Sequence, residues 1–163
     1  MRACAETGTD YVDLCGEPAW MHEMIAEHSE TAKASGARIV FSCGFDSVPF
    51  DLGVYFLQQA AKERFGAEVS RVKGRVRVMK GTFSGGTLAS FKATMAAAGK
   101  QPELIKVLMN PFALTPSFIG PKQPSGLAPI YEDDLNSWSA PFVMATINTK
   151  NIHRSNYLMA HQY

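Results

Sequence analysis

The sequence predicts an α/β fold with two lobes, and two observations carry this prediction. Between residues 11 and 66, short β-branched runs alternate with amphipathic segments that each end at a glycine. Parallel sheets with helical crossovers are built in this order. From residue 67 onward, valines alternate with polar residues, as in a strand that has one face in solvent. The second lobe should therefore hold a mixed or antiparallel sheet.

The first lobe is expected to contain two strand-helix units. The run YVDLCG (11–16) predicts a strand, and the amphipathic segment after it predicts a helix closed by Gly36. The run ARIVFSCG (37–44) predicts the second strand, and the next apolar segment predicts a second helix that ends at Gly66. The short connections favour parallel strands joined by a right-handed crossover.

The second lobe is expected to begin with a long strand over residues 67–81. The TFSGG turn that follows should start a helix that ends at Gly99, and Pro102 should start a shorter one. Residues 110–141 contain six of the nine prolines and little periodicity, so they predict a long surface loop.

The last predicted element is a helix with Pro141 in its first turn. Apolar anchors such as Phe142 and Leu158 recur along it at helical spacing. Because polar Asn148 and Asn151 fall between these anchors, we expect the helix to be interrupted there.

Composition and charge narrow the class of protein. The 163 residues are 46% hydrophobic and 19% charged, and 16 Lys and Arg against 15 Asp and Glu leave a net charge of +1. Because the signs are interspersed, nucleic acid is not expected as a partner. Three cysteines without a C-x-x-C pair favour a reducing, cytoplasmic location and no metal site. No signal peptide or membrane span is expected, and a membrane or lipid contact stays open without support.

The stretch CGFDSVPFD (43–51) lies where the second predicted strand passes into the second helix. In open α/β sheets, ligands bind outside the carboxyl ends of strands, at helix amino termini that attract anions. The same residues also fit a purely structural role at the start of a helix, since Asp46 or Ser47 can cap a helix and Pro49 suits its first turn. Both interpretations stay open from the residues alone.

The other motifs are less specific. The SGGT turn, made of Ser84, Gly85, Gly86 and Thr87, could cradle an anion or could be only a turn. Neither G-x-G-x-x-G nor G-x-x-x-x-G-K-[ST] occurs, so the chain encodes no phosphate loop of either kind. Members of a Ser-His-Asp triad cannot be assigned from spacing, because they meet in space rather than in sequence.

Five motifs in order give a resemblance to a known family: GTDYVDLCGE, CGFDSVPFDLG, SGGTLAS, NPFAL and APFVMATINT with RSN after it. They resemble the saccharopine dehydrogenase-like oxidoreductases, especially the bacterial branch called trans-acting enoyl reductases. The resemblance implies an NAD(P)-dependent oxidoreductase. Its amino-terminal Rossmann domain would be followed by a mixed α+β domain for substrate and dimer contacts, so a small-molecule substrate and a homo-oligomer are expected.

The chain departs from that family at its start, where a strand, a glycine-rich phosphate loop and a helix are missing. The resemblance therefore implies a fragment. Residues 1–62 would be the carboxyl-terminal βα units of a Rossmann-like parallel sheet, and residues 63–163 would be a truncated substrate and dimerisation lobe. NAD or NADP would serve the longer parent, whereas tight cofactor binding by this chain alone is not expected. The alternative is a stand-alone, non-catalytic binding or dimerisation module.

The resemblance also implies roles for individual residues. Asp46 is the catalytic candidate, and Arg154 would supply a charge for an acidic or carbonyl substrate, although a plain role at a helix end stays open for it. The SGGT residues 84–87 would contact substrate. Six residues would lie by the cofactor: Tyr11, Asp13, Glu17, Gly44, Phe45 and Ser47.

Overall fold

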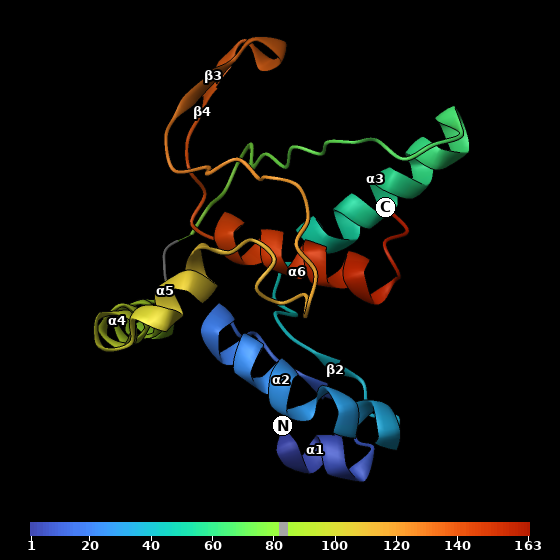
Figure 1. Cartoon of the computed structure of the whole chain (residues 1–163). Coiled ribbons are helices and arrows are strands. Elements are labelled where there is room, and N and C mark those ends of the chain that lie inside the picture. Colours follow the sequence, from blue (N-terminus) through green and yellow to red (C-terminus); the bar gives the residue numbers. More distant parts are fainter. Residues whose placement is uncertain (82–84) are drawn as a thin grey trace.

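The computed structural model describes residues 1–81 and 85–163 as an α/β protein in which helices predominate over two small sheets (Figure 1). Its elements in chain order are α1 (Arg2–Thr7), β1 (Tyr11–Val12), α2 (Pro18–Ser35), β2 (Ile39–Val40), α3 (Val48–Phe65), α4 (Gly85–Lys100), α5 (Pro102–Met109), β3 (Ile130–Glu132), the 3-10 helix η1 (Asp133–Leu135), β4 (Ser137–Ser139) and α6 (Ala145–Leu158).

The predicted strand-helix order of the first lobe is confirmed. Strands β1 and β2 pair in parallel, with Tyr11 opposite Ile39, and α2 forms the crossover between them. Helices α2 and α3 end just before Gly36 and Gly66, as predicted. Each strand is only two residues long, however, so the described chain contains a parallel pair and not the extended Rossmann-like sheet that the sequence led us to expect.

The buried core lies beside this parallel pair. Met21 and Ile25 of α2 pack against Leu114 from the loop after α5, and Cys15, Trp20 and Phe41 surround them. The rings of Trp20 and Phe41 meet edge to face, with their centroids 5.9 Å apart. This core fixes the segments that leave β1 and β2, which carry the site described below.

The sequence-based interpretation of the second lobe is partly wrong. Residues 67–81 form no strand in the structure, and instead two short antiparallel strands, β3 and β4, lie within the predicted loop 110–141. The alternation of valine and polar residues describes a chain that is able to form a strand, but a strand also needs a neighbour for its backbone hydrogen bonds. The helices predicted near Gly99 and after Pro102 are confirmed as α4 and α5.

Helix α6 also differs from its prediction. It begins at Ala145, after Pro141, and runs without interruption to Leu158. Asn148 does not break the helix because its side chain is buried and donates a hydrogen bond of 2.8 Å from Nδ2 to the carbonyl oxygen of Asp46. A polar residue at a buried helical position thus marks a contact with the start of α3 and not an end of the helix.

Helix α3 packs on α6 along one side and leaves apolar residues of the other side exposed. Leu52 and Phe56, one turn apart, are both mostly solvent-accessible. The α3 face is therefore a candidate contact surface.

Across the described parts of the chain, none of the helices combines the length and the apolar character needed to cross a bilayer.

We expect the chain to self-associate through the α3 face, because contiguous exposed apolar surface is rarely left uncovered. Replacing both Leu52 and Phe56 by Glu should convert oligomers into monomers in sedimentation experiments at about 10–50 μM, a range that detects weak association. The matched control places Glu at exposed Ile119 and Leu127, in the segment between α5 and β3, and should leave the association unchanged. A monomeric wild-type chain would contradict this expectation.

Candidate functional site

An open pocket of about 520 Å³ lies beside the carboxyl end of β1, which pairs in parallel with β2. The carboxyl ends of parallel strands meet at one edge of a sheet, which is where α/β proteins bind ligands. The pocket takes its lining from β1, from the loop after it and from the first turn of α2. Its lining residues are Tyr11, Asp13, Cys15, Glu17 and Trp20.

Asp13 holds the two loops at this edge together. Its Oδ1 accepts hydrogen bonds from the backbone N–H groups of Cys15 and Ser42, each 2.9 Å long, and its Oδ2 accepts one of 3.1 Å from the Tyr11 hydroxyl. Its backbone carbonyl accepts a further bond of 2.7 Å from the N–H of Cys43. One residue thus connects the loop after β1 to the loop after β2.

Ser42 completes this connection from the other side. Its buried hydroxyl donates a bond of 2.6 Å to the carbonyl oxygen of Cys15, and its backbone adopts a left-handed conformation with φ of 56°. Such a conformation is uncommon for a residue with a side chain. Here it lets both the N–H and the hydroxyl of Ser42 form hydrogen bonds with the loop after β1.

Glu17 connects the pocket to α4. Its Oε2 accepts bonds from the Cys15 thiol, 2.9 Å away, and from the N–H of Gly16, while Oε1 pairs with the hydroxyl of Ser90. Burial alone would raise the pKa of Glu17, but the hydrogen bonds from Cys15 and Ser90 outweigh it and lower the pKa. The pocket therefore contains a carboxylate that stays charged at neutral pH.

The neighbouring hydroxyl and thiol are held in their protonated forms. Burial, and then the bond to Asp13, raise the pKa of Tyr11. Burial, helped by the bond to Glu17, raises the pKa of Cys15 to about 12. Both groups can therefore donate hydrogen bonds near neutral pH, and the Cys15 thiol is not a nucleophile there.

The stretch that includes Gly44 and Asp46 leads into α3 next to this pocket. A Cβ atom added to Gly44 would lie 2.8 Å from Oδ1 of Asp46 and 3.5 Å from Leu14, so the Asp46 carboxylate lies directly against the backbone of this turn. Ser47 occupies the position before α3, but its side chain makes no capping hydrogen bond. The side chain of Phe45 is 84% exposed. Of the six residues predicted to lie by the cofactor, the pocket thus unites Tyr11, Asp13 and Glu17, with the other three in the adjoining turn.

The two catalytic candidates are not brought together. Arg154, on α6, donates a hydrogen bond of 3.0 Å from its guanidinium to the carbonyl oxygen of Leu114, and burial lowers its pKa. Asp46 is connected to the same helix only through its carbonyl oxygen, by way of Asn148. Within residues 1–81 and 85–163, no salt bridge joins Asp46 to Arg154.

The predicted substrate turn is only partly described. Ser84 lies outside the described residues, and Gly85, Gly86 and Thr87 lie in the first turn of α4. The link between α4 and the pocket is Ser90, which the sequence analysis did not single out. Its only sequence signal is a hydroxyl one turn after Thr87 in a mostly apolar helix. Cys15, Trp20 and Ser42 were also not predicted as site residues, because their residue types carry no specific signal at these positions.

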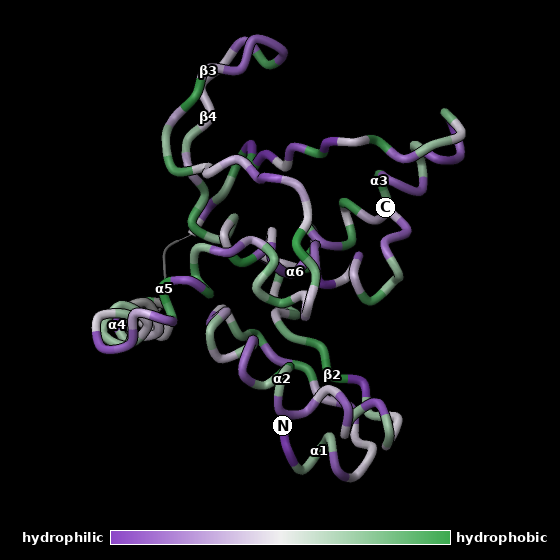
Figure 2. Tube along the Cα trace, in the orientation of Figure 1, coloured by the Kyte–Doolittle hydropathy of each residue, from purple (hydrophilic) through white to green (hydrophobic). Residues whose placement is uncertain are grey.

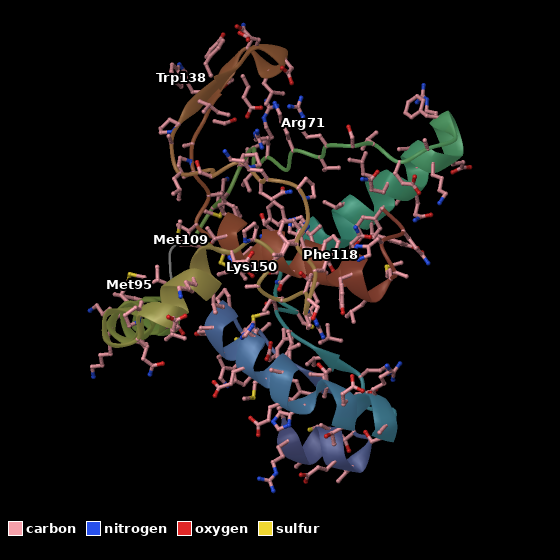
Figure 3. The ribbon with its side chains drawn as sticks, in the orientation of Figure 1. Arg71, Met95, Met109, Phe118, Trp138 and Lys150 are labelled. Carbon is pink, nitrogen blue, oxygen red and sulfur yellow. The ribbon has the colours of Figure 1, made fainter. Side chains whose placement is uncertain are left out.

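A second polar group, on α6, lies near the centre of the molecule (Figure 3). The ammonium of Lys150, whose side chain is buried, donates hydrogen bonds of 2.9 and 3.1 Å to the carbonyl oxygens of Leu108 and Thr146. Burial lowers the pKa of Lys150 to about 8, and burial together with the Lys150 charge lowers the pKa of His153 to about 4. The ring of His153 stacks on Phe112. This group holds α5 and the following loop against α6, which is a structural role.

The three cysteines are free, and no cluster of potential metal ligands is found in the described portion of the chain. The fold and the pocket together define an α/β protein with an open surface pocket beside a short pair of parallel strands.

Several curated proteins are similar to the chain over nearly its whole length. The chain is 41% identical over 169 residues to a Mycobacterium tuberculosis protein that is provisionally named a trans-acting enoyl reductase. It is 36% identical over 173 residues to the trans-acting enoyl reductase of Mycobacterium leprae, and 34% identical over 173 residues to that of Mycobacterium ulcerans. These alignments cover 99% of this chain but only 40% or 41% of each relative. No family model and no solved structure matches the sequence.

These names correct one expectation. The assignment to the saccharopine dehydrogenase-like oxidoreductases is wrong, because the relatives that cover the whole chain are named trans-acting enoyl reductases. The narrower resemblance, to trans-acting enoyl reductases, agrees with those names. The chain spans about 40% of the length of the M. tuberculosis relative.

The raised pKa of Cys15 leads to a prediction about thiol reactivity. At pH 8, Cys15 in the folded chain should react with iodoacetamide at least about 100-fold more slowly than in the urea-unfolded chain, because the thiolate is the reactive form. Mass spectrometry of peptides resolves Cys15 from Cys4 and Cys43. Glu17→Gln, which removes a charge that opposes ionisation, should speed the reaction in the folded chain several-fold. Equal rates in the folded and unfolded chains would show that the thiol is neither buried nor bonded as described.

Proposed function

We propose that this chain is part of an NAD(P)H-dependent oxidoreductase that reduces an enoyl substrate, and that the pocket beside the carboxyl end of β1 receives the nicotinamide and ribose end of the cofactor. The observation that carries this proposal is the position of that pocket beside the carboxyl end of a strand in a parallel pair. The names of the relatives supply the reaction type. In this proposal, residues 1–62 belong to the cofactor lobe and residues 63–163 to the substrate and dimerisation lobe.

The chemistry of the lining fits this end of the cofactor. The carboxylates of Asp13 and Glu17 are acceptors, and ribose hydroxyls and the nicotinamide amide are donors. Trp20 adds an aromatic surface. The five lining residues include no cation, which suits a neutral ribose or amide better than a phosphate.

The roles of this chain's residues in the reaction would be binding and positioning. When bound, the reduced cofactor supplies a hydride for the carbon-carbon double bond of the substrate. Asp13 and Ser42 would keep the two loops in place around it, and Glu17 would hold α4, with Gly85, Gly86 and Thr87 in its first turn, beside the pocket. Asp46 stays the candidate for a polar group near the reacting atoms, since its carboxylate folds over Gly44 next to Leu14.

Cofactor affinity should be weak in this chain. The sequence has no G-x-G-x-x-G loop, so the pyrophosphate lacks the helix amino terminus on which such cofactors usually rest. We expect a dissociation constant of about 1 mM or weaker for NADH or NADPH, which corresponds to about −4 kcal/mol.

The two tryptophans provide a test with an internal control. Trp20 lines the pocket, whereas Trp138 lies on β4, far from α2 (Figure 3). In ¹⁵N-labelled chain, titration with NADH or nicotinamide mononucleotide at millimolar concentration should shift the indole N–H signal of Trp20 saturably and leave that of Trp138 unchanged. Trp138→Phe assigns the two signals, and Glu17→Ala should weaken the Trp20 shift. Equal shifts of both signals, or none, would contradict the proposed cofactor site, and binding at micromolar concentration would contradict the expected weak affinity.

A further inference from the structure

Residues 70–80, which we call the basic segment, lie extended without forming a strand. In Figure 1 the segment runs from the region of the end of α3 toward the hairpin of β3 and β4, and Figure 2 shows hydrophilic and hydrophobic residues alternating along it. No backbone-to-backbone hydrogen bond joins it to another described residue. Its cations are Arg71, Lys73, Arg75, Arg77 and Lys80.

Three contacts hold this region extended, and the first lies at Val69. The side-chain amide of Gln58 on α3 donates a hydrogen bond of 3.0 Å to the carbonyl oxygen of Val69 and accepts one of 2.9 Å from its N–H. A neighbouring strand would make the same pair of bonds. Gln58 therefore occupies both backbone groups of Val69, as a neighbouring strand would.

The second contact is the close approach of Gly74 to α3. A Cβ atom at residue 74 would lie 3.3 Å from Cδ1 of Phe50, whose ring stacks on Phe142 with centroids 5.6 Å apart. Glycine thus lets the backbone of the segment rest on this aromatic pair.

The third contact is an ion-pair network around Glu132 of β3, whose side chain is only 2% exposed. Its carboxylate accepts a hydrogen bond of 2.9 Å from Lys73 and closer ones from Arg75 and Ser139. Bonds from Ser139 and Lys73 lower the pKa of Glu132 to about 2, so the carboxylate is charged. The basic segment therefore already binds one acidic side chain of an extended strand.

Odd-numbered and even-numbered residues of the segment point to opposite faces, because successive side chains of an extended chain alternate. By this alternation Arg71, Lys73, Arg75 and Arg77 share one face, and Val72, Val76, Val78 and Lys80 share the other. The side chains of Val76 and Val78 are 43% and 79% exposed. The carbonyl oxygen of Gly74 accepts a bond of 2.7 Å from the Arg75 guanidinium. A chain whose backbone groups make no backbone-to-backbone hydrogen bonds, and whose valines are exposed, is a template for a further strand.

We propose that the basic segment is a docking edge for an extended polypeptide strand in which acidic and apolar residues alternate. The strand would add its backbone hydrogen bonds to residues 70–80, its acidic side chains would face Arg71 and Arg77, and its apolar side chains would face Val76 and Val78. Because the segment is already held extended, little conformational entropy remains to be lost on docking.

Charge argues against a second copy of the same segment as the occupant. In an antiparallel pair, residues directly opposite each other share a face. Two identical segments that bring valine opposite valine therefore also bring cation opposite cation, which is destabilising. An alternating acidic strand satisfies both faces at once.

The experiment uses the 163-residue chain and a fluorescein-labelled peptide that alternates valine with glutamate. We expect saturable binding by fluorescence anisotropy and new protection of backbone amides within residues 70–80 by hydrogen exchange. A peptide with lysine in place of glutamate should bind at least about tenfold more weakly, which corresponds to about 1.4 kcal/mol.

Two variants separate charge from backbone pairing. The double variant Arg71→Glu, Arg77→Glu spares the network around Glu132 and should bind the lysine peptide in preference to the glutamate peptide. Its matched control, Lys33→Glu with Lys122→Glu, makes the same change in net charge at exposed positions elsewhere and should bind like the wild type. Val76→Pro removes one backbone N–H and should weaken binding of the glutamate peptide without changing the circular dichroism of the helices.

Three results would overturn the proposal. One is equal binding of the glutamate and lysine peptides, or protection of amides only outside residues 70–80. Another is protection of these amides that rises with protein concentration while the peptide does not bind, since this would make a second copy the occupant. The third is binding of single-stranded RNA or anionic phosphatidylglycerol vesicles, sensitive to the double charge reversal, in the absence of peptide binding.

Discussion

The carboxylate of Asp13 is the interaction on which the site of this protein depends. The parallel strands β1 and β2 are two residues long, so their own hydrogen bonds cannot fix the loops that follow them. Asp13 accepts backbone N–H groups from both loops and thereby holds them in one arrangement. A buried N–H without a partner costs about 1–3 kcal/mol, so the carboxylate contributes an appreciable fraction of the 5–15 kcal/mol that is typical of a small domain.

The rest of the molecule is attached to these loops by a few long-range polar contacts. Glu17 bonds to Ser90 on α4, and the carbonyl oxygen of Asp46 accepts a bond from Asn148 on α6. The apolar core of α2 and Leu114 lies beside them. Helices that are distant in sequence are thus positioned around the strand ends by side chains from the site itself. A pocket built in this way can bring a cofactor lobe and a substrate lobe to one edge, as the proposed function requires.

Local sequence patterns predicted the elements whose ends are set locally. The glycines that end α2 and α3, and the alternation of strand and helix, were sufficient for the first lobe. The patterns failed where a partner distant in sequence decides the outcome. The valines of residues 67–81 have no neighbouring strand among the described residues, and Asn148 is buried in α6, where it bonds to Asp46. Tyr11, Asp13 and Glu17 were expected beside the cofactor because of the family resemblance, and the pocket brings these three together. Ser90 could not be predicted, since only the packing of α4 brings it to Glu17.

The most direct measurement of the central claim compares Asp13→Ala with Asp13→Asn. Urea unfolding, followed by circular dichroism, gives the free energy of unfolding, and the chemical shift of the Trp20 indole reports on the pocket. The alanine variant should lose about 1–3 kcal/mol, because the N–H groups of Cys15 and Ser42 lose their acceptor, and its Trp20 signal should move. The asparagine variant keeps an oxygen at this place and should lose less than half as much. Equal losses in the two variants, or an alanine variant within about 0.5 kcal/mol of the wild type, would contradict the role given to Asp13.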